Sequence, residues 1–317
     1  MRLVIALGGN ALLRRGEVPD ASVQLEHVRA AARALAPLLQ EHEVLLVHGN
    51  GPQVGLLAIE SAGDTTLSRP YPLDALGAQT QGMVGYWLCQ ALGNAGLTRP
   101  VVAVVSQTVV DADDPAFAAP DKLIGAVYPE PVARARERED GWTIARDADG
   151  WRRTVPSPLP VRLVELPVVL QLLRAGIAVV CAGGGGAPVV TDGAAGLRGV
   201  EAVVDKDRVA ALLALAVEAD ELLVLTDVPQ VVRDHGTDAA TPLAVLSVQE
   251  IERTTFAAGS MGPKVQACAQ FTTTTGRPAR IGALEQAVQV LAGTKGTTVV
   301  TTDQAIGDAR ATASSPA

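Results

Sequence analysis

Three of the four lysines in the chain stand where an ammonium group could act on a phosphoryl group. Lys206 lies between Asp205 and Asp207, whose carboxylates could hold it in place or position Mg²⁺. Lys264 follows a glycine turn and is expected in the first turn of a helix, where a cation is unfavourable unless an anion lies nearby. Lys122 lies in a separate polar region. Ammonium groups from three loops suit a transferring phosphoryl group, because its charge spreads over several oxygens.

Glycine-rich turns are expected at the ends of several strands. Gly8-Gly9-Asn10 and Gly49-Asn50-Gly51 each come after an apolar run, and residues 183–186 and Gly282 are expected in similar places. Without Cβ atoms, the backbone N–H groups of such turns can approach an anion closely. In an open α/β sheet, ligands bind at the carboxyl ends of the strands. These turns therefore predict an anion site at that edge of the sheet.

Familiar fingerprints of phosphate and nucleotide sites do not occur. The sequence contains no G-x-x-x-x-G-K-[ST], and no G-x-G-x-x-G follows the first predicted strand. The four histidines lack metal-ligand spacing, and no G-x-S-x-G motif supplies a nucleophile. His48, which precedes the second glycine turn, is either a general base or a packed, hydrogen-bonded histidine, and the second reading is favoured. Any phosphate must therefore be bound by another arrangement.

Buried strands alternate with helices along the chain. Aliphatic runs bounded by Gly, Pro or Asn predict strands at 3–7, 44–47, 101–105, 177–181 and 222–225. Ala- and Leu-rich patterns predict helices at 21–40, 74–92, 163–174 and 206–219. This alternation indicates an α/β fold with a mostly parallel sheet of the doubly wound kind.

Residues 111–160 interrupt this alternation with Pro, Asp, Arg and Glu. We interpret them as a small inserted, lid-like subdomain, with a long surface loop as the alternative. Asp149-Gly150 predicts a hairpin turn inside it. A second polar stretch, 233–241, is expected to be a surface hairpin or loop. Residues 303–317 are small and polar, and a disordered tail is expected there.

Composition excludes several classes of protein. Hydrophobic residues make up 48 % of the 317 residues, which excludes global disorder, and aromatic residues only 3 %, which predicts an aliphatic core. The net charge of −8 disfavours nucleic acid as a partner. No apolar run approaches the roughly 18 residues of a membrane span. Cys89, Cys181 and Cys268 are expected to be buried thiols, which fits a reducing cytoplasm.

Distinctive strings of residues follow one another from about residue 2 to about residue 301. They are LGGNA from Leu7, HGNGPQVG from His48, QGMVGYW from Gln81, GW at 141–142, GWRR from Gly150, VPSP from Val155, GGGG from Gly183, VDKD from Val204, and GSM from Gly259 with PK at 263–264. Together they resemble the carbamate kinases, a branch of the amino acid kinase superfamily. The Gly-Gly-Asn and Asp-Lys-Asp strings alone would indicate only the superfamily. The strings from His48 and Gln81 are specific to the carbamate kinases.

This resemblance implies an open αβα sandwich with a small protruding subdomain, a homodimer, and the Mg²⁺-dependent reaction ATP + carbamate ⇌ ADP + carbamoyl phosphate. It implies one amino acid kinase domain at 1–302, with a substrate lobe (1–205) that carries the subdomain 111–160 and a nucleotide lobe (206–302). The phosphoryl group would pass directly and in line between the substrates. Carbamate is already a nucleophilic anion, so positioning and charge neutralisation would carry the catalysis.

By matched position, the resemblance also implies roles for individual residues. Lys206 and Lys264 would neutralise the phosphoryl oxygens. Lys122 would close over carbamoyl phosphate, and Asp205 would orient the lysines. The carbamate and the phosphoryl group would be cradled by Gly8, Gly9, Asn10, Gly49, Asn50 and Gly51. ATP or ADP would lie against Asp207, Thr226, Asp227, Gly259, Ser260 and Met261, and no side chain is assigned as a metal ligand.

Two alternatives stay open at this point. One is another amino acid kinase that acts on a carboxylate such as acetylglutamate, which would need a pocket for a second charged end. The other is a non-catalytic nucleotide or metabolite sensor on the same fold, which the loss of a catalytic lysine would mark. The carbamate-kinase strings argue against the first, and the presence of Lys206 and Lys264 argues against the second.

Overall fold

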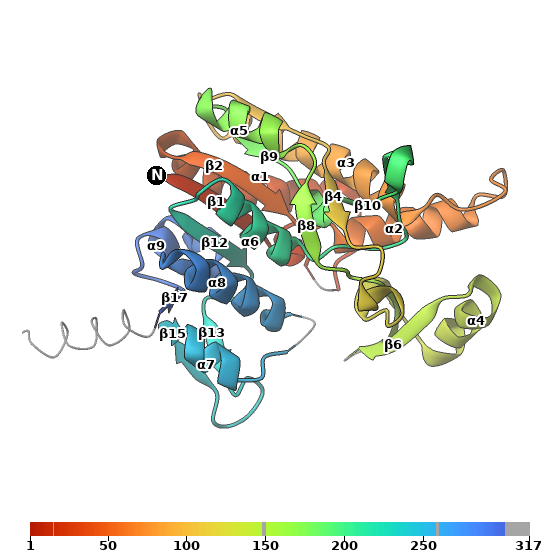
Figure 1. The fold of residues 1–317 in the computed structure, drawn as a ribbon. Coiled ribbons are helices and arrows are strands. Elements are labelled where there is room, and N and C mark those ends of the chain that lie inside the picture. Colours follow the sequence, from red (N-terminus) through yellow and green to blue (C-terminus); the bar gives the residue numbers. More distant parts are fainter. Residues whose placement is uncertain (15, 148–149, 258–259, 302–317) are drawn as a thin grey trace, which may run out of the picture.

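The computed structural model describes residues 1–14, 16–147, 150–257 and 260–301. Within these residues, eight strands form the central sheet in the order β15-β17-β16-β12-β1-β2-β9-β3 (Figure 1). Neighbouring strands are parallel except β16 and β17, so the predicted mostly parallel sheet is confirmed. The strands are β1 (Arg2–Leu7), β2 (Glu43–His48), β3 (Val101–Ala103), β9 (Ala178–Val180), β12 (Glu221–Thr226), β15 (Val245–Ser247), β16 (Ala279–Ala283) and β17 (Thr297–Val300).

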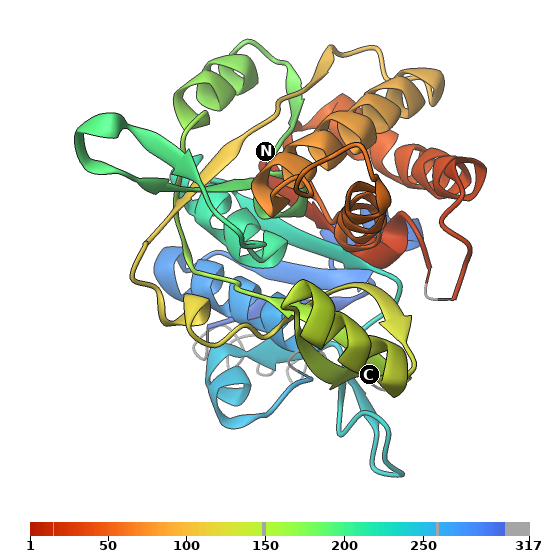
Figure 2. The ribbon, with the colours of Figure 1, turned by 90° about the vertical axis from the view of Figure 1, so that its right-hand side faces the viewer.

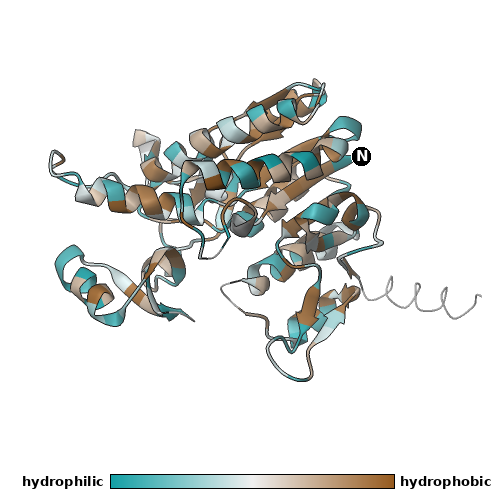
Figure 3. Cartoon of the chain, turned by 180° about the vertical axis from the view of Figure 1, so that it is seen from behind, coloured by the Kyte–Doolittle hydropathy of each residue, from teal (hydrophilic) through white to brown (hydrophobic). Residues whose placement is uncertain are grey.

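Helices cover both faces of this sheet, as an αβα sandwich requires. The helices are α1 (Ala21–Glu41), α2 (Gly51–Gly63), α3 (Leu73–Asn94), α5 (Leu166–Arg174), α6 (Lys206–Ala216), α7 (Val248–Arg253), α8 (Met261–Thr275) and α9 (Ala287–Leu291). The side chains of β1 alternate between two hydrophobic cores, one on each face of the sheet. Val4 and Ala6 pack with α5, α6 and α8, whereas Leu3, Ile5 and Leu7 pack with α1, α3 and α9. Figure 3 shows the strands predominantly apolar and the hydrophilic residues on the outer faces of the helices.

Between residues 111 and 160, the described residues contain a small set of strands and a helix. These elements are β5 (Lys122–Tyr128), α4 (Glu130–Asp140), β6 (Thr143–Asp147) and β7 (Gly150–Val155). Among the described residues, β5, β7 and β6 make a three-stranded antiparallel sheet. Figures 1 and 2 show these elements, drawn in yellow and olive, at the side of the molecule and outside the two helix layers. The hairpin predicted at Asp149-Gly150 is confirmed by the pairing of β6 with β7, although residues 148–149 themselves lie outside the described residues.

The remaining strands make smaller antiparallel or mixed sheets. One contains β4 (Gln107–Val110), β8 (Pro160–Leu163), β10 (Ala187–Thr191) and β11 (Leu197–Gly199). The hairpin predicted at 233–241 is confirmed by the antiparallel pair β13 (Val231–Arg233) and β14 (Thr241–Leu243). Short 3₁₀ turns are η1 (Gly9–Ala11), η2 (Pro115–Phe117), η3 (Gly183–Gly185), η4 (Gly193–Ala195) and η5 (Leu284–Gln286). In the described part of the chain, no helix is both long and apolar enough to cross a membrane. The tail expected at 303–317 lies outside the described residues.

Several predicted boundaries were wrong. The helix predicted at 163–174 begins at Leu166, because Leu163 ends β8 and pairs with Thr108 of β4. The helix predicted at 206–219 ends at Ala216, and Glu218 has a φ of 55°, which a continuing α-helix does not allow. The strand predicted at 101–105 ends at Ala103. Gly282 lies inside β16 and not after it.

Candidate active site

The first two glycine turns lie against each other at the carboxyl edge of the central sheet. Strands β1 and β2 are parallel neighbours paired as far as Leu7 and His48, so the turns that follow them emerge side by side. A Cβ atom added to Gly49 would lie 2.8 Å from the nitrogen of Gly9 and 3.3 Å from Cε of Lys206. A side chain at position 49 would therefore displace either the backbone of the first turn or the lysine.

The residues next to these glycines occupy the beginnings of helical turns. Asn10 lies in η1, and Gly51 is the first residue of α2. Asn50 precedes α2, and its side chain makes no capping hydrogen bond to the helix; its Nδ2 atom donates a hydrogen bond to Oγ1 of Thr80 at 2.7 Å. The N–H groups of the first turn of α2 are thus left for another acceptor, and a helix N-terminus favours an anion.

The third glycine turn, residues 183–186, packs against His48 and Asn50; it was expected at this edge of the sheet, but none of its residues was assigned a role in the site. Gly184 has a φ of +64°, and a Cβ atom there would lie 2.1 Å from the side-chain nitrogen of Asn50. A Cβ atom on Gly183 would lie 2.3 Å from Nε2 of His48.

His48 is a packed, hydrogen-bonded residue. Its side chain is 1 % exposed, and its Nδ1 atom lies 2.9 Å from the carbonyl oxygen of Gly49. The pKa of His48 is lowered from 6.5 to about 4, chiefly by burial and to a smaller extent by the nearby charge of Lys206, while the hydrogen bond to Gly49 acts in the opposite direction. The imidazole is therefore neutral at neutral pH, and in this tautomer Nδ1–H donates to Gly49.

Two lysines are each held by a carboxylate at the start of α6. Asp205 caps the helix, because its Oδ1 atom accepts the N–H groups of Asp207 at 2.9 Å and Arg208 at 3.3 Å. Its Oδ2 atom accepts a hydrogen bond from Nζ of Lys122 at 2.5 Å. Nζ of Lys206 donates to Oδ1 of Asp207, also at 2.5 Å. The flanking carboxylates were predicted to hold Lys206 or to position Mg²⁺, and Asp205 to orient the lysines; in the structure Asp207 is hydrogen-bonded to Lys206, and Asp205 to the distant Lys122.

These pairs are largely withdrawn from solvent. The side chains of Lys122 and Asp205 are 27 % and 12 % exposed, and that of Lys206 is 12 % exposed. Burial by itself would raise the pKa of Asp205, but the charges of Lys122 and Lys206 and the hydrogen bonds at the helix start outweigh it and hold the pKa well below its usual range. Asp205 is therefore an anion at neutral pH.

Lys264 lies in the first turns of α8, close to the Lys206 pair. Its Nζ atom donates to the carbonyl oxygen of Ser260 at 2.8 Å. Burial and then the charge of Lys206 lower the pKa of Lys264, while Asp207 and its neighbouring carboxylates act in the opposite direction. The ammonium groups of Lys206 and Lys264 therefore lie close enough to interact unfavourably, and a bound anion would relieve this repulsion. Cys268, buried nearby, is an inert thiol, because burial raises its pKa.

The predicted nucleotide residues border this region from β12 and α8. Thr226 ends β12, and its Oγ1 atom would lie 3.4 Å from a Cβ atom on Gly8. The same Oγ1 atom donates to Oδ1 of Asp227 at 2.9 Å. Met261 begins α8 and packs against the core. Ser260 precedes it and is exposed, and Gly259 lies outside the described residues. The roles assigned to all these positions remain predictions.

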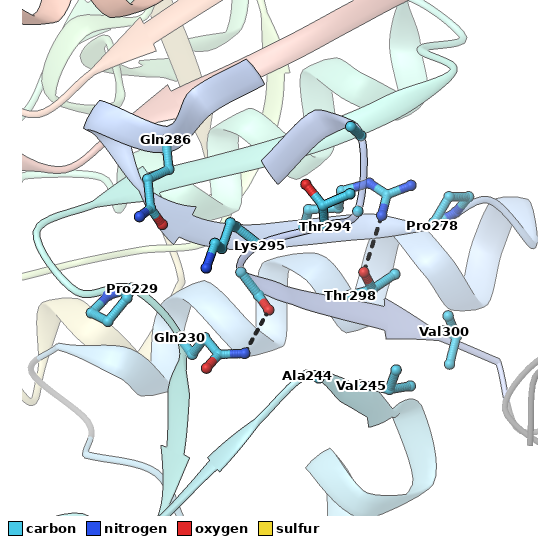
Figure 4. Close-up of a pocket in the computed structure, with 14 residues that line it drawn as sticks. Pro229, Gln230, Ala244, Val245, Pro278, Gln286, Thr294, Lys295, Thr298 and Val300 are labelled. Atoms are coloured by element: carbon cyan, nitrogen blue, oxygen red, sulfur yellow. Dashed lines mark hydrogen bonds between the residues drawn. The ribbon is translucent and has the colours of Figure 1, made fainter. Parts of the chain in front are cut away.

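A separate groove of about 840 Å³ lies among the C-terminal elements (Figure 4). It runs along β16 and β17, past Gln230, Arg280 and Lys295, and contains none of the predicted site residues. Gln230 donates to the carbonyl oxygen of Gly296 at 2.9 Å, and Arg280 donates to Thr298 and pairs with Glu221. The guanidinium group of Arg280, one of the two charged side chains that line this groove, is therefore engaged within the chain.

Comparisons with known proteins agree with this geometry. The model of the amino acid kinase family matches residues 1–283. The chain is 47 % identical over 300 residues to the carbamate kinase of Haemophilus influenzae, covering 94 % of this chain and 96 % of that protein. It is 44 % identical over 297 residues to the carbamate kinase of Escherichia coli, covering 94 % and 98 %.

Solved structures of carbamate kinases have the same fold as this chain. The carbamate kinase from Giardia lamblia bound to AMP-PNP has a TM-score of 0.84 and 37 % identity, covering 95 % of this chain and 98 % of that one. The same enzyme bound to citric acid has a TM-score of 0.88. The chain thus belongs to the amino acid kinase family, and within that family to the carbamate kinases.

Proposed function

We propose that the chain catalyses the reversible phosphoryl transfer ATP + carbamate ⇌ ADP + carbamoyl phosphate. The observation that carries this proposal is the meeting of Lys206 with the two glycine turns, where Cε of Lys206 would lie 3.3 Å from a Cβ atom on Gly49. This contact puts an ammonium group beside backbone that can approach an anion closely. The full-length likeness to carbamate kinases identifies the acceptor as carbamate.

The glycine turns and the lysines would divide the work of the transfer. Gly8, Gly9 and Asn10 with Gly49, Asn50 and Gly51 would cradle carbamate and the moving phosphoryl group. Lys206 and Lys264 would neutralise its oxygens, and Lys122 would approach from the inserted subdomain. Carbamate brings its own nucleophilic charge, so no general base is needed, and the buried, neutral state of His48 is consistent with this.

The nucleotide would lie over the C-terminal part of the chain. Thr226, Asp227, Ser260 and Met261 border the lysines there, and the AMP-PNP complex of the Giardia enzyme supports an adenine nucleotide as ligand. We propose residues 206–302 as the nucleotide lobe and 1–205 as the substrate lobe.

Magnesium would enter with the nucleotide. In the described part of the chain, no three His, Cys, Asp or Glu side chains gather as a metal cage. The carboxylates of Asp205 and Asp207 are already engaged by lysines at 2.5 Å. The residues therefore fit an ion whose ligands are mainly phosphate oxygens and water, as Mg²⁺ prefers, and the ion would supply charge neutralisation at those oxygens.

The proposed activity also suggests where the chain acts and what it binds. We propose a cytoplasmic homodimer whose partners are small molecules, with no nucleic acid or membrane as a partner. The net charge of −8 supports the exclusion of nucleic acid. Sedimentation velocity on the purified chain would test the dimer.

The enzyme assay is ATP formation from ADP, Mg²⁺ and carbamoyl phosphate, with acetyl phosphate as a parallel donor and Lys264→Ala as the control variant. We expect rapid ATP formation that is faster with carbamoyl phosphate and depends on Lys264. Protein that binds nucleotide but forms no ATP would contradict the proposal. It would direct the search to acetylglutamate and related carboxylates, or to a sensor.

A further inference from the structure

Gly55 on α2 and Gly125 in β5 are in direct backbone contact. A Cβ atom added to Gly55 would lie 2.2 Å from Cα and 2.8 Å from the nitrogen of Gly125. Gly125 has a φ of +70°, and the pairing of β5 with β7 shifts between Ile124 and Tyr128. The inserted subdomain thus meets the main body through a strand that bends at a glycine and rests on another glycine.

Apolar packing fixes the same strand on α2. Ile124 is 2 % exposed and shares a small core with Val54 of α2 and Val155 of β7, to which Leu73, Leu76 and Val203 also belong. The N–H group of Val203 donates to the carbonyl oxygen of Pro156 at 2.9 Å. The base of the subdomain is therefore attached both to α2 and to the segment that leads into Asp205.

Lys122 stands on this fixed strand, three residues before Gly125. It lies opposite Val155 in the β5–β7 pair, and its Nζ atom reaches Oδ2 of Asp205 at 2.5 Å. The depth at which β5 rests on α2 sets the distance between this ammonium group and the start of α6.

We propose that Gly55 is a positioning residue for phosphoryl transfer, because the absence of its side chain lets β5 rest close enough to α2 for Lys122 to enter the site. The inference rests on the role proposed above for Lys122. An alanine at position 55 must move the backbone of Gly125 away by roughly 1 Å, since ordinary contact begins near 3.4 Å. A displacement of that size at a positioned catalytic group lowers the rate by up to about 10²-fold.

The test is a double-mutant cycle on carbamoyl phosphate-dependent ATP formation. Lys122→Ala is expected to lower kcat by about 10- to 10²-fold, and Gly55→Ala by a similar factor, with the KM for ADP unchanged. The double variant should be no slower than Lys122→Ala alone, because Gly55 acts through that lysine. Gly63→Ala, the same change in the last residue of α2 with nothing within 4 Å, is the matched control and should retain wild-type turnover.

Different results would refute the positioning role of Gly55 and the catalytic role of Lys122. The positioning role would be overturned if the fold-losses in kcat of the two single variants multiply in the double variant, or if Gly55→Ala has a normal kcat. A Lys122→Ala enzyme of normal kcat would instead remove Lys122 from the proposed function. If Gly55→Ala does not fold, Ile124→Ala weakens the same contact from the other side, and the same lack of additivity with Lys122→Ala is expected.

Discussion

Acidification below pH 6.5 is expected to destabilise the folded chain through His48. Its imidazole is buried against Gly183 and Gly49, and burial lowers its pKa to about 4, against 6.5 for an exposed histidine. The unfolded chain therefore takes up a proton first as the pH falls. The stability that a neutral His48 preserves is present above pH 6.5 and is lost progressively between pH 6.5 and pH 4.

The size of this effect follows from the difference between the two pKa values. Each pKa unit corresponds to about 1.4 kcal/mol, so the full loss is about 3 kcal/mol below pH 4. About 2 kcal/mol of it is expected between pH 7 and pH 5, where most carboxyl groups remain ionised. The charge of Lys206 lowers the pKa of His48 together with burial, whereas the hydrogen bond to Gly49 raises it and so reduces the total shift.

Urea unfolding at pH 7, 6 and 5 measures the effect in the wild type, in His48→Gln and in His235→Gln. His235 lies exposed in the β13–β14 hairpin loop and serves as the matched control. His48→Gln is expected to be less stable at pH 7 but to lose about 2 kcal/mol less than the other two proteins on going to pH 5. Equal losses in all three proteins would refute the neutral, buried state of His48.

Three further changes test the site. Lys206→Ala or Lys264→Ala should lower turnover by roughly 10²-fold or more, because transition-state charge stabilisation is lost; a circular-dichroism melt checks the fold, and near-wild-type turnover would remove that lysine from the site. Asp205→Asn should keep α6 capped but release Lys122, so turnover falls while stability changes little. Asp205→Ala should cost about 1 kcal/mol more in urea unfolding, and equal stability of the two variants would contradict the capping role. Removal of divalent ions with EDTA should abolish ATP formation, and added Mg²⁺ should restore it; activity that survives chelation would exclude the metal.

The central sheet could be predicted because several of its strands are unbroken aliphatic runs. Residues 3–7 are aliphatic without a break, and all five are fully buried between two helix layers. The ends of elements were harder to predict, because tertiary pairing decides them. Leu163 fits an apolar helical pattern, yet it ends β8 through its pairing with Thr108. Helix α2 was missed, since glycines at its start and within it lower its helix propensity and mask its pattern.

The sequence indicated which residues could belong to the candidate site, but it did not indicate which lysine pairs with which carboxylate. A lysine between two aspartates suggests that both carboxylates serve it, and only the fold shows that Asp205 is taken by Lys122, which lies 83 residues away. The contact of Gly55 with Gly125 is equally non-local. A glycine inside a helix is costly, so Gly55 carried a signal, but its partner could not be named from the sequence.

The electrostatics of the site explain why it needs so many fixed partners. Lys122, Lys206 and Lys264 lie among the carboxylates of Asp205, Asp207 and Asp227, so three positive groups are held close together before any substrate binds. A protonated His48 would add another charge beside Lys206, and burial prevents this. The carboxylates of Asp205 and Asp207 hold their lysines in place, so an incoming phosphoryl group meets ammonium groups that are already oriented. Charges that need no reorganisation during the reaction stabilise its transition state most effectively. The same partners that keep three cations together in the absence of substrate therefore also prepare them for the transfer.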